Sequence, residues 1–313
     1  MFSANEIIPA LWLGARSDVE CEKGNFLVKH HIDHVLTIDT EPPAILCPNI
    51  KHKFVELVDL DFADLLIHLE ECFAFIEEAR SVGSVLVHCL VGMSRSASVV
   101  AAYLMYKEKI SLEDALAKIR EKRSYVRPNE GFMEQLSLFE AMGCDLNPHH
   151  PLMKFHKLGQ FANQMQGSRR HHNAEIPKEL IAKDPNQKSG EEGSEQQETV
   201  FRCRKCRRAL FKEGSVVGHN PGQGQVSFKW HKQTQTTSSS TETCTSHFIQ
   251  PVAWMEHLLL GCKDGKLACP KCNSRIGCFN WAGQQCSCGA WITPAFQIHK
   301  NRVDEQKLHQ LHR

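Results

Sequence analysis

The residues best suited to do chemistry form one short segment, His88 to Ser96, which reads HCLVGMSRS. Cys89 carries a thiol, Arg95 carries a guanidinium six residues later, and Gly92 lies between them. A loop that enters a helix N-terminus points backbone N–H groups inward, where they bind a tetrahedral anion. A guanidinium adds a planar, bidentate clamp on that anion. The same positive field favours the thiolate of Cys89, so the segment predicts attack by sulfur on a bound phosphoryl group.

The other residues of this segment have separate expected roles. Ser96 is expected to donate a hydrogen bond to the Cys89 sulfur, and His88 to hold the loop by hydrogen bonding rather than to take a proton. The expected phosphate-binding loop comprises Leu90, Val91, Gly92, Met93, Ser94 and Arg95. The alternative is that Cys89 is an inert buried thiol. A histidine, a glycine and an arginine at these spacings favour catalysis instead.

This segment resembles the His-Cys-x5-Arg-Ser motif of cysteine-dependent protein phosphatases, and the following Ala-Tyr-Leu-Met resembles their dual-specificity branch. The stretch IIPALWLGARSDV and the residues Arg127 to Leu136 extend the resemblance across the N-terminal half of the chain. Val91 departs from the smaller alanine that the family usually carries. The resemblance implies hydrolysis of phosphotyrosine and of phosphoserine or phosphothreonine in phosphoproteins, through a phosphocysteine intermediate and without a catalytic cofactor.

Such a reaction also needs a proton donor for the leaving oxygen. Family members place this acid on the loop after a strand, with a second aspartate five residues later at the start of a helix. That spacing matches Asp59 and Asp64. The resemblance therefore implies that Asp59 is the general acid and that Asp64 is a helix N-cap. Asp61 lies on the same loop and stays open as the alternative acid.

The elements that must position these residues follow from hydrophobic patterning. Apolar, β-branched runs predict strands over 34–38, 53–58 and 85–87. Apolar residues predict helices over 96–105, and at helical spacing over 65–76 and 112–119. Strands that alternate with helices indicate an α/β fold, with a central, mainly parallel sheet flanked by helices.

Length and composition favour two domains in a reducing compartment. A chain of 313 residues fits about two domains. We expect a catalytic domain over 1–148, a helix and a disordered linker over 149–200, and a zinc-binding domain over 201–313. No apolar stretch reaches the roughly 20 residues that span a bilayer, and the N-terminus lacks signal-peptide features. The fourteen cysteines beside a thiol site favour the cytoplasm and nucleus, and a monomer without membrane contact is expected.

Closely spaced cysteines in the C-terminal part predict two structural zinc ions. One site is expected from two close pairs, Cys269/Cys272 and Cys286/Cys288, with Gly277 and Gly289 in the left-handed turns after them. The other is expected from Cys203, Cys206, His219 and Cys244. His247 stays open as a substitute for His219.

The zinc-binding part is also basic. Residues 201–313 carry nine Lys and seven Arg against six Asp and Glu, a formal charge of +10. Five basic residues surround the first cysteine pair: Arg202, Arg204, Lys205, Arg207 and Arg208. This suits an RNA or ribonucleoprotein surface, although a simply solvated basic face is the alternative. A dual-specificity domain followed by these cysteines resembles a zinc-binding subgroup of the family, which implies a role with precursors of the large ribosomal subunit. Catalysis would then be either the main function or secondary to docking.

Overall fold

The computed structural model describes residues 4–20, 25–44, 49–167, 176–187, 199–219 and 244–307. The chain divides into two compact units, Met1–Asn147 and Pro148–Arg313. Among the described helices, none is long and apolar enough to cross a membrane.

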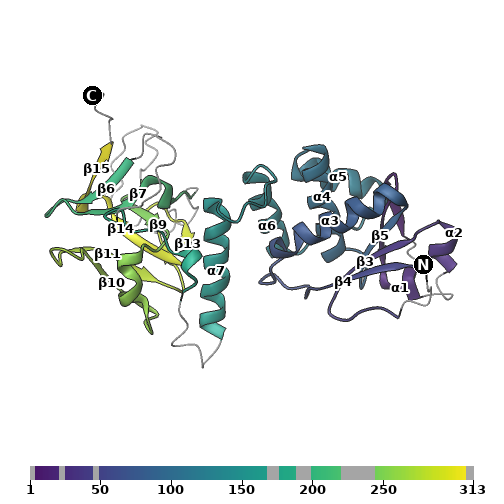
Figure 1. Ribbon diagram of the computed structural model, residues 1–313, viewed down its shortest axis with the longest axis horizontal. Coiled ribbons are helices and arrows are strands. Elements are labelled where there is room, and N and C mark those ends of the chain that lie inside the picture. The colour runs from purple at the N-terminus through teal and green to yellow at the C-terminus, as the bar shows by residue number, and fades with distance from the viewer. Residues whose placement is uncertain are drawn as a thin grey trace, which may run out of the picture. The chain divides into compact units, whose positions relative to one another are not determined.

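The N-terminal unit is built on one five-stranded sheet (Figure 1). Its strands are β1 (Asn5–Ile8), β2 (Leu11–Ala15), β3 (His34–Asp39), β4 (Lys51–Glu56) and β5 (Val85–Cys89). The strand order is β1-β2-β5-β3-β4, and only the edge strand β1 is antiparallel to its neighbour. Every residue of β3 and β5 is buried, as expected for inner strands of a parallel sheet. The predicted mainly parallel sheet is therefore confirmed, and Cys89 ends its central strand.

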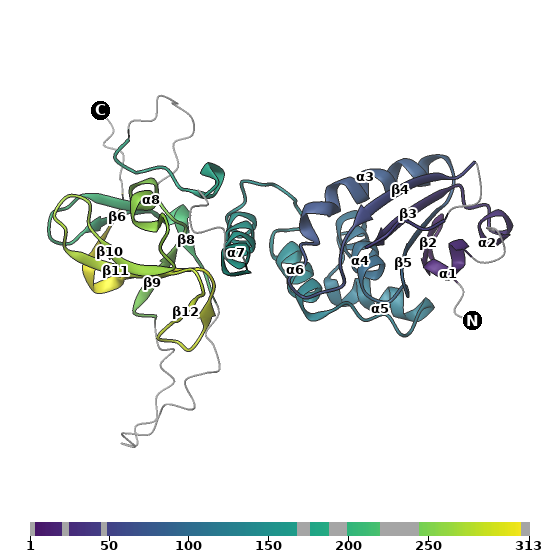
Figure 2. The same ribbon diagram turned by 90° about the horizontal axis from the view of Figure 1, so that it is seen from below.

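Helices cover this sheet: α1 (Arg16–Glu20), α2 (Asn25–Lys29), α3 (Leu66–Val82), α4 (Arg95–Glu108), α5 (Leu112–Lys122) and α6 (Glu130–Ala141). Figures 1 and 2 show α3 to α6 along one side of the sheet and the short α1 and α2 on the other. The first eleven residues of α4 are all buried, so this helix forms the centre of the core. Ser111 and Asn129 are the N-caps of α5 and α6, because their side chains accept hydrogen bonds from the first turns. The two caps fix where these helices start.

The C-terminal unit is mainly antiparallel. One sheet has the order β10-β11-β14-β9-β8, a second has the order β15-β6-β7, and β12 pairs with β13. The strands are β6 (Thr199–Cys203), β7 (Ala209–Lys212), β8 (Val216–Val217), β9 (Ser246–Ile249), β10 (Asp264–Ala268), β11 (Arg275–Asn280), β12 (Gln284–Gln285), β13 (Trp291–Ile292), β14 (Ala295–His299) and β15 (Val303–Lys307). The helices are α7 (Pro151–Gly167), η2 (Lys178–Leu180), η3 (Glu213–Ser215), η5 (Ala253–Met255), α8 (Glu256–Leu259) and η6 (Lys300–Arg302). Aromatic side chains, among them Phe211 and Phe296, fill the core between these elements.

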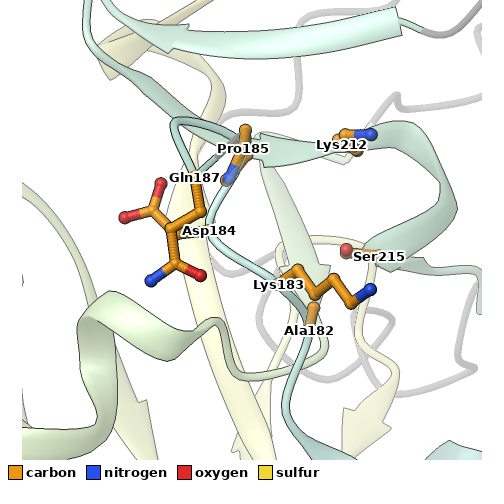
Figure 3. A pocket seen from close by; sticks show the side chains of 7 residues that line it. All are labelled: Ala182, Lys183, Asp184, Pro185, Gln187, Lys212 and Ser215. Carbon is orange, nitrogen blue, oxygen red and sulfur yellow. The ribbon is translucent and has the colours of Figure 1, made fainter. Parts of the chain in front are cut away.

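The helix predicted after the catalytic domain and part of the expected linker belong to this unit. Helix α7 places Leu158 and Ala162 in its core, where both are fully buried. The segment 176–187 places Leu180 in the same core, and Asp184 forms an ion pair with Arg208 at 2.5 Å. Figure 3 shows a pocket lined by Ala182, Lys183, Asp184, Pro185 and Gln187 of this segment, together with Lys212 and Ser215. These segments have too few apolar residues to form a core alone, but their apolar residues pack into the core of the C-terminal unit. The rest of the expected linker, 168–175 and 188–198, lies outside the described residues.

Candidate active site and candidate metal centres

The sulfur of Cys89 lies at the base of a loop between β5 and α4. It accepts a hydrogen bond from the Gly92 N–H and another from the Ser96 hydroxyl, each at 3.2 Å. Cys89 is only 2% exposed. Two donors aimed at one buried sulfur hold it in a fixed position at the base of the loop. The structure therefore brings Cys89 and Ser96 together as the sequence predicts.

Glycine at position 92 is required by the shape of this loop. Its φ is +72°, and a Cβ there would lie 2.2 Å from the carbonyl oxygen of Gly14. Only glycine combines that backbone angle with so close an approach. The tight turn is what directs the Gly92 N–H at the Cys89 sulfur.

Arg123, which was not predicted from the sequence, binds the backbone of the loop on the side away from the anion site. Its side chain is fully buried and donates to the carbonyls of Gly92 at 2.8 Å and Val91 at 3.1 Å, and to the Asn5 side chain at 3.0 Å. In a planar trans peptide the C=O and the next N–H point in opposite directions. Because the Val91 carbonyl points at Arg123, the Gly92 N–H points into the anion site.

Arg95 closes the loop and is anchored by an aspartate. It is only 5% exposed, and its Nη1 donates to Asp39 Oδ1 at 2.6 Å and to the Leu57 carbonyl at 3.3 Å. Burial would raise the pKa of Asp39, but the Thr40 N–H and the Arg95 charge hold it below its usual value. Arg16 lies 3.1 Å from the other Asp39 oxygen. The carboxylate therefore stays charged and fixes the guanidinium.

His88 lies behind the nucleophile as a neutral, buried ring. Its Nε2 is 2.7 Å from the Thr37 hydroxyl, and its Nδ1 is 3.3 Å from the Cys89 carbonyl. Burial lowers the pKa of His88 to about 4. A ring that is uncharged at neutral pH and engaged on both sides fits the positioning role expected of it.

Of the two candidate acids, only Asp59 is held against the loop. Its Oδ1 accepts from the Ser94 hydroxyl at 2.6 Å and from the Asn129 amide at 2.9 Å. Its Oδ2 lies 3.7 Å from Arg95 Nε. Asp61 instead accepts a long bond from the Gly131 N–H at 3.5 Å. The geometry favours Asp59 as the residue that reaches the anion site.

The helix that follows Asp59 starts differently from the expectation. Asp64 was expected to cap it, but α3 begins at Leu66. The N–H groups of Leu65 and Leu66 donate to the side-chain oxygen of Gln135, at 2.8 and 3.3 Å. The cap therefore comes from α6, seventy residues away in the sequence, which local spacing does not reveal.

In the C-terminal unit, the eight predicted metal ligands form two groups of four, but the predicted partition is wrong. One group is Cys203, Cys206, Cys269 and Cys272, and the other is His219, Cys244, Cys286 and Cys288. The physical reason is β11, which runs between Cys272 and Cys286. An extended strand of that length covers about 20 Å, so the two close pairs lie at opposite ends of it.

Each close cysteine pair forms a tight turn that a backbone hydrogen bond closes. The N–H of the residue after each second cysteine returns to the first cysteine's carbonyl: Arg207 to Cys203, Asn273 to Cys269, and Gly289 to Cys286, at 2.8, 2.8 and 2.9 Å. These three residues have positive φ. Gly289 is as expected, whereas Gly277 is needed for a different reason: a Cβ there would lie 1.9 Å from the Gln297 carbonyl across the β11–β14 ladder.

The donor sets fit zinc. Cys203 and Cys272 have sulfurs 3.7 Å apart, Cys206 and Cys269 have sulfurs 3.5 Å apart, and His219 Nε2 lies 3.3 Å from the Cys244 sulfur. A tetrahedron with bonds of about 2.3 Å to sulfur has edges close to these values. His247 is not in either group; its ring lies 4.7 Å from that of Phe201. His219, and not His247, is therefore the histidine that can bind the metal ion.

Part of the basic cluster near Cys203 is ion-paired. Arg204 and Arg207 both pair with Asp304, the first at 3.6 Å, and Arg208 pairs with Asp184. Three of the five cations expected on an open basic face therefore have carboxylate partners. The acidic residues come from distant segments, which the local charge pattern does not show.

Comparison with known proteins finds relatives that match nearly the whole chain. Residues 11–142 match the family model for the dual specificity phosphatase catalytic domain. Dual specificity protein phosphatase 12 of Mus musculus is 44% identical over 313 residues, covering 97% of this chain and 89% of the mouse protein. The Homo sapiens protein of that name is 40% identical over 311 residues, covering 97% and 88%. The crystal structure of the Yvh1 phosphatase domain from Chaetomium thermophilum covers 46% of this chain and 99% of its own, at 30% identity and a TM-score of 0.42.

Proposed function

The chain belongs to the dual specificity protein phosphatase family, and we propose that it hydrolyses phosphotyrosine and phosphoserine or phosphothreonine esters of proteins through a phosphocysteine intermediate. The observation that carries this mechanism is the buried Cys89 sulfur, which accepts hydrogen bonds from Gly92 and Ser96 in a loop closed by Arg95. No cofactor is needed for either step.

In the first step the Cys89 thiolate attacks phosphorus. A sulfur–phosphorus bond forms and the bond from phosphorus to the ester oxygen breaks. The loop N–H groups and the Arg95 guanidinium stabilise the charge on the remaining phosphoryl oxygens. Asp39 holds Arg95 in place for this task, because the two form a short ion pair in the interior.

Asp59 supplies the proton that the leaving oxygen takes. Ser94 and Asn129 both donate to Oδ1. Ser94 and Asn129 are thus positioning residues, because their hydrogen bonds to Oδ1 hold the Asp59 side chain beside the anion site.

In the second step a water molecule attacks the phosphocysteine. The Asp59 carboxylate accepts a proton from that water, phosphate forms, and the sulfur–phosphorus bond breaks. The Ser96 hydroxyl, 3.2 Å from the sulfur, stabilises the departing thiolate.

Three variants of the full chain test this mechanism on an aryl phosphate. Cys89→Ser should abolish turnover, yet retain phosphate binding because the loop and Arg95 remain. Asp59→Asn should lower kcat by about 10²–10⁴-fold, and the matched Asp61→Asn should change it by less than about threefold. Turnover by Cys89→Ser, or a larger loss in Asp61→Asn than in Asp59→Asn, would contradict the assignment.

We propose that the two metal groups hold two structural zinc ions. When bound, zinc would cross-link β-hairpin turns and stabilise the fold of the C-terminal unit. The eight ligands leave no position for a substrate in either group, so the ions take no part in phosphoryl transfer.

We infer a second function, docking of the C-terminal unit on precursors of the large ribosomal subunit. The support is the resemblance stated for the zinc-binding subgroup together with the excess of basic residues. Within the described residues, no carboxylate pairs with Arg275, Lys300 or Arg302. Burial is the main cause of the lowered pKa of His299, and the charges of Arg275 and Arg302 nearby lower that pKa further. These cations replace the neutralised arginines as the candidate phosphate contacts.

Co-sedimentation of the full chain with large-subunit precursors tests this docking. Arg275→Glu/Arg302→Glu should weaken it at least tenfold and reduce its salt dependence, because phosphate contacts release counterions. Lys178→Glu/Lys183→Glu, on the segment 176–187, is the matched charge reversal and should leave it unchanged. Equal loss in both variants would contradict a specific surface.

The proposed site of action is the cytoplasm and nucleus, with the chain as a monomer. A thiolate nucleophile and metal-bound cysteines both need a reducing environment. Imaging of a tagged full chain, with sedimentation equilibrium of the purified protein, tests both statements.

A further inference from the structure

Exposed apolar side chains are concentrated around the nucleophile. Of the twelve large hydrophobic side chains that are exposed among the described residues, six lie on two short loops beside Cys89. We call these six the apolar rim: Val58, Leu60, Phe62, Leu90, Val91 and Met93. Phe62 is the most exposed of them, at 64%. Exposed apolar groups that occur singly need no explanation, but a concentration of them marks a binding surface.

The two loops of the apolar rim are held together at the anion site. Ser94 donates to Asp59 at 2.6 Å, and Arg95 donates to the Leu57 carbonyl at 3.3 Å. Asn129 ties both loops, because its side chain donates to Asp59 and its N–H donates to the Ser94 hydroxyl. The two loops that carry the apolar rim therefore lie side by side at the catalytic site.

The charges of the loop that carries Leu60 and Phe62 select against acidic occupants. Besides the acid Asp59, the loop from Leu57 to Leu66 carries two further aspartates, Asp61 and Asp64, and no lysine or arginine. A substrate with carboxylates beside its phosphorylated residue would meet like charge there. A substrate with apolar neighbours would bury Leu60 and Phe62 instead.

We propose that the apolar rim binds the residues on either side of the phosphorylated residue, and that the preferred substrate is a protein segment in which those residues are apolar. This inference rests on the proposed function, since the phosphate must occupy the loop at Cys89 for its neighbours to reach the apolar rim. Leu60 and Phe62 are the specificity-determining residues, because both are exposed and both lie on the loop that carries Asp59, outside the phosphate-binding loop.

Two phosphotyrosyl peptides that differ only in the adjacent residues, leucine in one and aspartate in the other, provide the test. The wild-type chain should hydrolyse the leucine peptide with a kcat/KM about tenfold higher, a modest value for burying one or two apolar side chains. Phe62→Ser and Leu60→Ser should reduce that preference to about threefold or less, mainly through KM. Both variants should hydrolyse p-nitrophenyl phosphate, which has no flanking residues, at the wild-type rate.

Val82→Ser is the matched control. Val82 is 71% exposed and ends α3, close to the start of β5, whereas Cys89 is at the other end of that strand. Its peptide preference should equal that of the wild type.

The outcomes separate the inference from the proposed function. Loss of activity toward p-nitrophenyl phosphate by Cys89→Ser supports the proposed mechanism whatever the peptides show. Equal hydrolysis of both peptides by the wild type would overturn the inference alone, as would an equal loss on both peptides and on p-nitrophenyl phosphate in Phe62→Ser. Binding of the wild type to phosphatidylcholine–phosphatidylserine vesicles that Phe62→Ser abolishes would assign the apolar rim to a membrane and also overturn it.

Discussion

Mild acid should destabilise the N-terminal unit through His88. The ring is fully buried against Thr37, and burial lowers its pKa from 6.5 to about 4. Because the folded-state pKa is below the unfolded value, the unfolded chain binds the proton first as the pH falls. The stabilisation from a neutral His88 is therefore complete above pH 6.5 and is lost as the pH falls toward 4. Between pH 7 and pH 5 this linkage removes about 2 kcal/mol from the free energy of unfolding.

Urea unfolding of the full chain at pH 7 and pH 5 measures this loss. Catalytic activity at each urea concentration reports the fraction of N-terminal units that remain folded. His88→Asn should be less stable than the wild type at pH 7, but its further loss at pH 5 should be smaller by about 2 kcal/mol. Thr37→Val is the matched control, because it removes the hydrogen bond to His88 and leaves the ring buried. It should lose stability at pH 7 and keep the pH dependence of the wild type.

A wild type and a His88→Asn variant with the same pH dependence would refute this reasoning. So would a Thr37→Val variant whose pH dependence disappears, because the hydrogen bond rather than burial would then control the protonation of His88.

Further predictions concern the Cys89 loop, the start of α3 and the two metal groups. Gly92→Ala should lower kcat/KM on an aryl phosphate by about 100-fold or more, because a displacement of about 1 Å at the loop misplaces the N–H donors. Gln135→Leu should lower the free energy of unfolding by about 1–3 kcal/mol, measured by urea titration, because two N–H groups at the start of α3 lose their acceptor. Elemental analysis should find one zinc in Cys203→Ser/Cys269→Ser, whose ligands share a group, and none in Cys203→Ser/Cys286→Ser, whose ligands belong to different groups.

The sequence predicted the parts of the site that depend on local structure. The Cys89 loop follows from one strand, one glycine and one helix start, all within a dozen residues. The groups that hold it are Asp39, Arg123 and Asn129, and each reaches the loop from a distant segment. Arg95 and Asp39 are 56 positions apart. Nothing in the composition near either residue predicts that pairing, since it is made by parallel strands that bring their ends to the same edge.

The metal ligands show the same division between local and distant information. The ligand types and the turn at each close cysteine pair could be predicted, because each turn involves only neighbouring residues. The sequence could not predict which turns bind the same ion, since every such turn offers the same two thiolates. The answer depends on β11, which is long enough to separate Cys272 from Cys286.

The crossed arrangement of the metal groups has a consequence for how the protein is made. In each group the first two ligands to be synthesised precede the last two by many residues. Cys203 and Cys206 precede Cys269 and Cys272, and His219 and Cys244 precede Cys286 and Cys288. During synthesis neither group is complete until about three-quarters of this unit has emerged, so the first thiols made remain for a long interval without their partners. The span from Cys206 to Cys269 is 63 positions, and an ion that closes so long a loop removes much chain entropy from the unfolded state. A truncation after Cys272 would therefore keep all four ligands of the first group, but it would separate His219 and Cys244 from their partners Cys286 and Cys288.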